Sequence, residues 1–123
     1  MNYVEALKWY QKAAEQGHAD SKASMGYMYM NGYVVKKDYK AALSWLQQSA
    51  EQGSPLGAIF LGDMYQMGTG VEQNHAKAVE LYRKAAEQGS SLAKAKLGFM
   101  YLYGYGVKKD PVEALRWYQA ASQ

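Results

Sequence analysis

The side chains that could do acid–base or nucleophilic chemistry are few and scattered in this sequence. It has two histidines, His18 and His75, and no cysteine. Catalysis needs a nucleophile or an acid–base pair within mutual reach, and no motif joins either histidine to a serine or a carboxylate. A hydrolytic role would need a polar pocket around a carboxylate, for which Asp63 is the one central candidate. We therefore predict that the chain is not an enzyme and has no catalytic residue.

Metal and cofactor motifs are also missing from the sequence. Two histidines without cysteine form a poor ligand set for zinc. Gly68 and Gly70 flank a threonine in a loop, but neither a P-loop nor a dinucleotide-binding glycine pattern is present. We therefore expect no metal and no cofactor.

Charge and hydropathy exclude two further kinds of partner. The 123 residues carry 14 Lys+Arg against 11 Asp+Glu, a formal charge of +3. Lys36-Lys37 and Lys108-Lys109 occupy equivalent loops, but Glu72-Gln73 interrupts what would be a basic stripe, so we expect no nucleic acid. No apolar run approaches the ~20 residues of a membrane span and no signal-peptide pattern opens the chain. The compartment stays open, with the cytoplasm as the default and a secreted origin as the alternative if a leader has been removed.

An internal repeat of 36 residues organises the whole sequence. Its clearest columns are a glycine and a tyrosine three residues later: Gly26, Gly62 and Gly98 with Tyr29, Tyr65 and Tyr101. A fixed period of this length is typical of a stacked array. Each period contains two stretches with helical spacing of apolar residues, so the repeat unit is a pair of helices.

Capping residues predict where these helices begin and end. Asp38, Asn74 and Asp110 are good N-caps, and Asn2 occupies the same column. Glycines at 17, 53 and 89 suit left-handed C-caps. Seven helices are predicted, near residues 2–16, 19–31, 38–52, 55–67, 74–88, 91–103 and 110–122. The fold class is an all-α solenoid of helix pairs forming one domain, with an unpaired helix at 1–17 and repeats at 18–53, 54–89 and 90–123.

Stacking explains the residue types in the repeated columns. The glycine column would let two helices approach closely, and Met28, Met64 and Met100 are predicted to belong to the core. The tryptophan column, Trp9, Trp45 and Trp117, is expected to fill the wider gaps between helices, with Leu81 filling its gap less completely.

These residues resemble the Sel1-like repeats, relatives of the tetratricopeptide repeats. The last copy carries the family pattern at Leu97, Gly98, Met100, Tyr101, Gly104, Gly106, Val107, Asp110, Ala114, Trp117 and Ala121. The copies depart from it at Val34, Asn74 and Leu81. The resemblance implies right-handed stacking of antiparallel helix pairs and a concave surface lined by the first helix of each pair. It also implies work as an adaptor or scaffold, often in bacteria. Some cysteine-rich relatives are associated with β-lactams, but their disulfide framework is missing here.

The concave face of the first helices is predicted to be an apolar groove for a protein or peptide partner. Its expected lining is Asp20, Tyr27, Met30, Leu56, Ile59, Asp63, Gln66, Met67, Leu92, Phe99, Leu102 and Tyr103. Large exposed apolar patches on soluble proteins usually mark interaction sites. Tyr27, Phe99 and Tyr103 would be anchors, with Asp63 and Gln66 orienting the partner. The alternative is that curvature closes the groove and its side chains pack on one another.

A structural role is the second hypothesis for the chain. Both ends expose surfaces that a neighbouring repeat would normally cover. The chain would then be an excerpt of a longer array, or would self-associate end to end.

Overall fold

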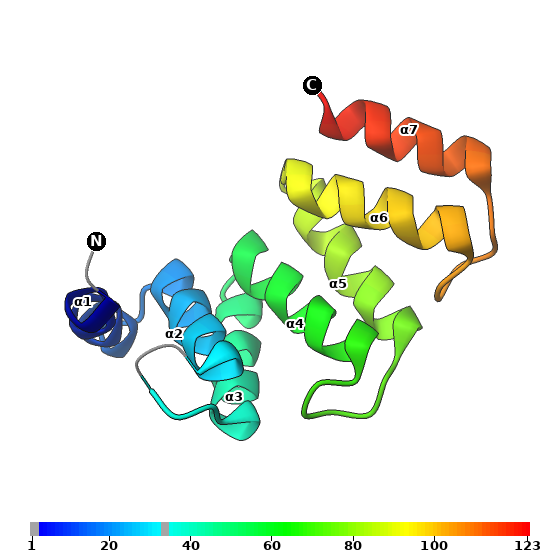
Figure 1. Cartoon of the computed structure of the whole chain (residues 1–123). Coiled ribbons are helices and arrows are strands. Elements are labelled where there is room, and N and C mark those ends of the chain that lie inside the picture. The colour runs from blue at the N-terminus through cyan, green and yellow to red at the C-terminus, as the bar shows by residue number, and fades with distance from the viewer. Residues whose placement is uncertain (1–2, 33–34) are drawn as a thin grey trace. The chain divides into compact units, whose positions relative to one another are not determined.

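The computed structural model describes residues 3–32 and 35–123, which form seven α-helices and no strand (Figure 1). The helices are α1 (Tyr3–Glu15), α2 (Ala19–Asn31), α3 (Tyr39–Glu51), α4 (Pro55–Met67), α5 (His75–Glu87), α6 (Ser91–Tyr103) and α7 (Pro111–Ala121). Every bound lies within one residue of its predicted position, and the all-α fold class is confirmed. The predicted N-cap Asn2 and the loop residue Val34 lie outside the described residues.

The chain forms two compact units, residues 1–61 and residues 62–123. Unit 1 contains α1, α2, α3 and the first half of α4, and in it α2 packs against both α1 and α3. Unit 2 contains the rest of α4 with α5, α6 and α7, and in it α6 packs against both α5 and α7. Each unit thus has a core formed between helix pairs.

Polar caps determine where the second helix of each pair begins. The side chains of Asp38, Asn74 and Asp110 accept hydrogen bonds from backbone N–H groups three residues later, at 3.1, 3.0 and 3.1 Å. Such caps satisfy amides that the first turn of a helix leaves unpaired. The N–H of each cap residue also donates to a tyrosine carbonyl nine residues earlier, so the same backbone bond closes the loop in all three copies.

Glycine ends α3 and α5, as predicted. Gly53 and Gly89 have φ of +90° and +92°, a conformation that residues with a β-carbon rarely adopt. The hydroxyl of Ser54 then accepts a hydrogen bond from the N–H of Gly57 at 3.2 Å. Because this cap follows the glycine directly, α4 begins at Pro55 without an intervening loop.

Three buried glycines, 36 residues apart, allow the two helices of each pair to approach closely. A β-carbon at Gly26 would lie 2.6 Å from Leu46 Cγ, and one at Gly62 would lie 2.8 Å from Tyr82 Cε1. The third glycine packs in the same way against a tyrosine ring of α7. The predicted role of this column in helix packing is confirmed.

The remaining core columns were predicted with mixed success. The three methionines of the 28, 64 and 100 column are buried, as expected, at 5%, 0% and 0% exposure. The prediction that Trp9 fills a gap between helices is wrong, because its side chain is 71% exposed. Trp45 and Trp117 are half-buried and Leu81 is buried. Within the described residues α1 packs against the helix after it, α2, whereas α3 and α7 pack against the first helix of their own pair.

Candidate functional site

Five of the predicted groove residues lie in unit 1: Asp20, Tyr27, Met30, Leu56 and Ile59. The first four are exposed or half-buried. Ile59 is only 2% exposed, so it belongs to the core and its assignment to the groove is wrong. The equivalent residue of α2, Ala23, is also fully buried, which places this column on the packed side of the first helices.

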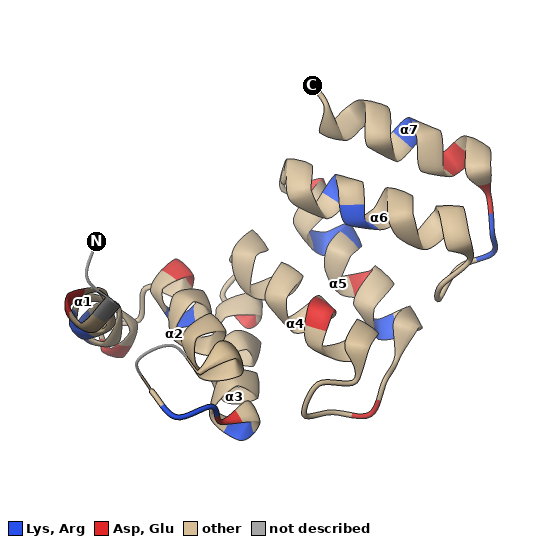
Figure 2. Ribbon diagram, in the orientation of Figure 1, with Lys and Arg blue, Asp and Glu red and all other residues tan. Residues whose placement is uncertain are grey.

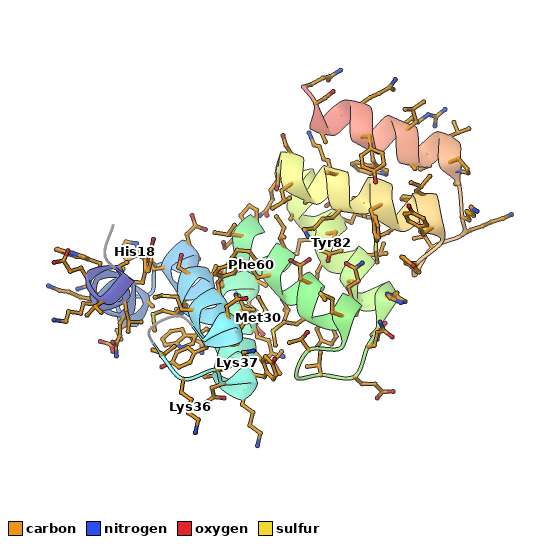
Figure 3. All side chains as sticks on the ribbon, viewed as in Figure 1. His18, Met30, Lys36, Lys37, Phe60 and Tyr82 are labelled. Carbon is orange, nitrogen blue, oxygen red and sulfur yellow. The ribbon has the colours of Figure 1, made fainter. Side chains whose placement is uncertain are left out.

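The exposed apolar surface of unit 1 is centred on a pair of rings. Tyr27 of α2 and Phe60 of α4 pack with ring centroids 4.8 Å apart; Figure 3 labels Phe60 on α4. At the start of the same two helices, the Ser54 hydroxyl donates to the Asp20 carboxylate at 2.5 Å. Asp20 therefore ties α2 to α4 within this unit.

Unit 2 contains the other seven predicted residues: Asp63, Gln66, Met67, Leu92, Phe99, Leu102 and Tyr103. Four of the apolar ones are strongly exposed: Met67 at 74%, Leu92 at 51%, Phe99 at 38% and Tyr103 at 55%. The fifth, Leu102, is half-buried. Unit 2 therefore carries the larger apolar surface.

Three rings of unit 2, Phe99, Tyr103 and Tyr105, form a cluster that we call the aromatic patch. The centroid of Phe99 lies 4.9 Å from that of Tyr103 and 5.7 Å from that of Tyr105, and the two tyrosine rings are 5.9 Å apart. His75, at the start of α5, stacks on Tyr105 with centroids 4.9 Å apart. These separations are those of favourable aromatic pairs. The patch is thus ordered although its rings are exposed.

Sequence reasoning missed Tyr105 and His75, because it considered only helix faces and Tyr105 lies in the loop after α6. The signal for this contact was Gly106. A β-carbon there would lie 2.5 Å from the His75 carbonyl carbon, so only a glycine lets this loop approach the start of α5. That approach places Tyr105 over the imidazole.

A polar cluster, made of Asp63, Gln66, Tyr82 and Lys96, lies beside the aromatic patch in unit 2. The Tyr82 side chain is fully buried, and its hydroxyl donates to Asp63 Oδ1 at 2.5 Å. The Gln66 amide lies 2.8 Å from the same hydroxyl. Because a phenol has one proton, the second contact is a hydrogen bond when the Gln66 NH₂ group faces the hydroxyl and donates to it. Figure 3 labels Tyr82 at the centre of this unit.

The electrostatics of the cluster hold Tyr82 in its neutral form. Burial, then the negative charge of Asp63 and the hydrogen bond to it, raise the pKa of Tyr82 far above its ordinary value of 10.0. Lys96 Nζ lies 3.0 Å from Asp63 Oδ1 and 5.7 Å from the centroid of the Tyr82 ring. The Lys96 ammonium therefore compensates the negative charge of the Asp63 carboxylate, which accepts the hydrogen bond from the Tyr82 hydroxyl.

Lys96 is the third residue that sequence reasoning missed, although two repeat columns contained the signal. Asp63 and Lys96 occupy the positions that hold Tyr27 and Phe60 one repeat earlier. In unit 1 this pair of positions makes an aromatic contact, and in unit 2 it makes an ion pair. The two columns change together because their side chains touch across neighbouring first helices.

An open hollow of about 410 Å³ joins the polar cluster to the aromatic patch. Its lining is Gln66, Met67, Gln73, His75, Phe99 and Tyr105. The Gln73 amide donates to the backbone carbonyl of Gln66 at 2.8 Å, so the loop before α5 forms one wall. The hollow thus has aromatic rings and a thioether beside amide groups. This lining suits a ligand that combines an apolar side chain with a polar peptide backbone.

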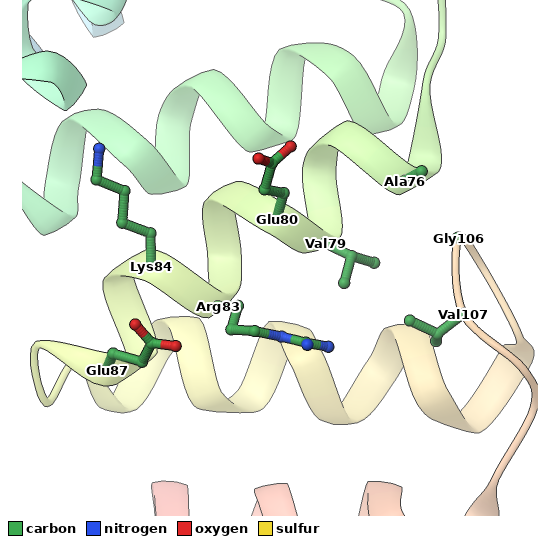
Figure 4. A pocket seen from close by; sticks show the side chains of 8 residues that line it. All are labelled: Ala76, Val79, Glu80, Arg83, Lys84, Glu87, Gly106 and Val107. Atoms are coloured by element: carbon green, nitrogen blue, oxygen red, sulfur yellow. The ribbon is translucent and has the colours of Figure 1, made fainter.

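A second hollow of unit 2, of about 490 Å³, has a different character (Figure 4). Glu80, Arg83, Lys84 and Glu87 of α5 line it together with Val107 of the loop after α6. Arg83 Nη2 donates to the Tyr101 hydroxyl at 2.9 Å. Charges of both signs are interspersed on the helices of each unit (Figure 2), and this hollow shares that mixed surface.

The polar cluster contains a single carboxylate, that of Asp63. Asp63 is the carboxylate with the most central position, and its Oδ1 already contacts Tyr82 and Lys96. Within residues 3–32 and 35–123, no group of three histidines, aspartates or glutamates is arranged to hold a metal ion. No helix of the described part combines the length and apolarity needed to cross a membrane.

Comparison with known proteins identifies the repeat. The family model described as Sel1 repeat matches residues 2–18, 19–54, 55–90 and 91–123. Among curated proteins, no relative matches the chain significantly.

Three solved structures are similar to the chain over nearly its whole length. A protective antigen of uropathogenic Escherichia coli with an SLR fold has a TM-score of 0.87 and 39% identity, over 94% of this chain and 25% of that protein. A Sel1 repeat protein from Oxalobacter formigenes has a TM-score of 0.87 and 39% identity, over 98% of this chain and 49% of that one. Helicobacter pylori cysteine-rich protein B has a TM-score of 0.73 and 26% identity, over 97% and 85%.

These likenesses bear on fold and origin. They confirm the predicted solenoid fold. The chain spans about a quarter of the E. coli protein and about half of the Oxalobacter protein. All three proteins are bacterial, which indicates a bacterial origin for this chain as well.

Proposed function

The chain belongs to the Sel1 repeat family, whose members are typically protein–protein interaction modules and generally non-catalytic scaffolds, and on this premise we propose that it is an adaptor. Its partner is a protein that presents an extended peptide segment with an apolar anchor side chain. The segment binds unit 2, where the anchor enters the hollow beside the aromatic patch.

The observation that carries this proposal is the exposure of an ordered set of rings. Phe99, Tyr103 and Tyr105 are 38%, 55% and 38% exposed although each contacts another ring of the patch. Aromatic side chains supply much contact area for few rotatable bonds. Rings that already support one another lose little further freedom on binding, which favours affinity.

The polar cluster would give the bound segment its direction. Gln66 lines the hollow and also contacts the buried Tyr82 hydroxyl, so its amide has a fixed position. The Lys96 side chain is 30% exposed beside Asp63 and is a donor for a backbone carbonyl. Met67, which is 74% exposed, has a flexible side chain that adapts its shape to irregular anchors.

Peptides selected from a random displayed library on the immobilised chain provide the test. A selected peptide is synthesised, and its Kd is measured with the parent chain and with Phe99→Ala and Tyr103→Ala variants. Truncating a hot-spot ring removes about 2 kcal/mol or more, so each variant is expected to raise Kd at least about 30-fold.

Trp9→Ala is the matched control. It removes a ring that is 71% exposed in unit 1, and the proposal expects the parent Kd for this variant. Far-UV circular dichroism checks that all three variants stay folded. If Phe99→Ala and Tyr103→Ala both bind the selected peptides as the parent does, the aromatic patch is not the binding surface.

A further inference from the structure

The loop before α5 differs in charge from the loops at the same place in the other two copies of the repeat. Lys36-Lys37 lie shortly before α3 and Lys108-Lys109 lie shortly before α7, whereas Glu72-Gln73 lie before α5. Figure 2 shows the loops before α3 and α7 with blue segments and the loop before α5 with a red one. Gln73 lines the hollow of about 410 Å³, so this difference falls at the proposed binding surface.

The segment that forms this side of the hollow has no lysine or arginine. Residues 62–76 contain two carboxylates, those of Asp63 and Glu72. None of the described residues that line the hollow is a lysine or an arginine. Lys96 of the polar cluster lies 3.0 Å from Asp63 Oδ1, so its charge is already compensated. A positive group that enters the hollow therefore meets no lysine or arginine in its lining.

Two side chains of the lining, which we call the wall amides, have oxygens left over for a hydrogen-bond donor; they are Gln66 and Gln73. The Tyr82 hydroxyl gives its single proton to Asp63, so Gln66 contacts this hydroxyl through its NH₂ group. The NH₂ group of Gln73 donates to the Gln66 backbone carbonyl at 2.8 Å. Both amides thus use their nitrogen within the protein and keep their oxygen as an acceptor. The wall is complementary to a group that only donates.

The aromatic rings of the hollow favour a positive charge as well. Phe99 and Tyr105 line the hollow, and each is 38% exposed. The face of an aromatic ring attracts a cation. A guanidinium group is planar and weakly hydrated, so it stacks on a ring while its N–H groups donate in its own plane. An ammonium group is compact and strongly hydrated, and it lacks this planar fit.

We propose that the segment bound by unit 2 carries an arginine, and that its guanidinium lies in the hollow between the wall amides and the two rings. This inference rests on the proposed function and specifies its partner. The hollow, at about 410 Å³, falls within the ~300–1,000 Å³ of ligand pockets, so it has room for the apolar anchor beside the arginine. Side chains two residues apart lie on one face of an extended segment. The arginine is therefore the second residue before or after the anchor.

A small probe tests the arginine site without any selected peptide. N-acetyl-arginine N-methylamide is titrated into the ¹⁵N-labelled chain at pH 8, where an ordinary imidazole is uncharged. N-acetyl-citrulline N-methylamide, a neutral analogue of nearly the same shape, is the control. We expect saturable shifts of the side-chain NH₂ signals of Gln66 and Gln73. The citrulline probe is expected to bind at least about fivefold more weakly, because it lacks the charge that strengthens the ring contact and the hydrogen bonds.

A pair of variants tests the charge of the loop. The double variant Glu72→Lys with Gln73→Lys restores the Lys-Lys pair of the other two copies, which the repeat already accommodates. It is expected to weaken the arginine probe about fivefold or more, because it adds three positive charges at the loop. The loss should shrink in about 0.5 M NaCl, which screens exposed charges. Circular dichroism checks that the variant stays folded.

Glu80→Lys is the matched control for the loop variant. Glu80 is an exposed residue of α5 and lines the charged hollow instead. The substitution adds two positive charges within the same unit, and we expect it to change the Kd of the arginine probe by less than about twofold. Equal losses in the two variants would show that general charge, and not the loop, decides the affinity, and would overturn the inference.

Selected peptides separate this inference from the proposed function. An arginine two residues from the anchor is expected in their sequences, and its replacement by citrulline should raise Kd about fivefold or more. If peptides bind through Phe99 and Tyr103 but tolerate citrulline, the adaptor proposal stands and the arginine inference fails. If no peptide is selected, the adaptor proposal fails and the probe titration decides on the arginine site by itself. An arginine probe that binds no better than the citrulline probe, or leaves the wall amides unshifted, overturns the inference.

Discussion

Replacing Gly62 with alanine tests the packing on which the polar cluster depends. The added β-carbon would lie 2.8 Å from Cε1, 3.1 Å from Cδ1 and 3.3 Å from Cζ of the Tyr82 ring. The ring is fully buried, and its hydroxyl is fixed by Asp63 and Gln66. Because the ring has no room to move, the helices must separate or the hydrogen bonds must lengthen.

The expected magnitude combines two opposing effects. Overpacking a well-filled core costs about 1–3 kcal/mol. Alanine is favoured over glycine inside a helix by roughly 0.5–1 kcal/mol. The net loss in the free energy of unfolding for Gly62→Ala is therefore about 1–2 kcal/mol.

Gly98→Ala is the matched control for this substitution. Its β-carbon would lie 3.1 Å from the Ala114 carbonyl oxygen and 3.1 Å from the ring of Tyr118. The ring is 37% exposed and can move away, and the contact with the carbonyl needs a shift of only a few tenths of an ångström. The change is expected to lie within about 0.5 kcal/mol of the parent, because the gain in helix propensity offsets the milder contact.

Urea denaturation followed by circular dichroism measures both variants against the parent, with the midpoint and the slope compared. A lower urea midpoint is expected for Gly62→Ala alone. A Gly62→Ala chain as stable as the parent would refute it, and so would equal losses in the two variants, which would mean that confinement of the ring does not decide the cost.

Three other substitutions test the caps and the polar cluster. Asn74→Ala removes the N-cap of α5 and should lower the free energy of unfolding by about 1 kcal/mol in urea. Tyr82→Phe should flatten the alkaline pH dependence of stability: the folded pKa of Tyr82 lies above the unfolded value of 10.0, so its contribution is complete below pH 10 and is lost as pH rises further. Urea midpoints of parent and variant at pH 9 and pH 11 measure this. A double-mutant cycle of Asp63→Asn and Lys96→Met should give a coupling energy of about 1 kcal/mol, and additive losses would contradict the ion pair.

The helices were predicted well from the sequence because the residues that mark their ends occur in three copies of the repeat. A polar N-cap, a glycine C-cap and a glycine in close packing recur every 36 residues. For α5, the N-cap Asn74 and the glycine Gly89 mark the two ends of the helix, and Gly62 marks the close contact with α4. The bounds of α5 were therefore predicted within one residue.

The site was predicted less completely, for two physical reasons. The angle around a helix separates core from surface only coarsely, and Ile59 falls on the core side of that division at 2% exposure. Contacts made by loops have no helical period at all, which is why Tyr105 and His75 were missed. Lys96 could have been predicted from the sequence, because the residue type at its repeat position changes together with the residue type at the position of Asp63.

An NMR titration of the ¹⁵N-labelled chain with a selected peptide tests the proposed binding surface most directly. The account predicts the largest backbone amide shifts at residues 63–67, at His75 and at residues 99–105, which surround the hollow and the aromatic patch. Shifts concentrated instead along the charged hollow of α5, or on α1 and α7, would contradict it.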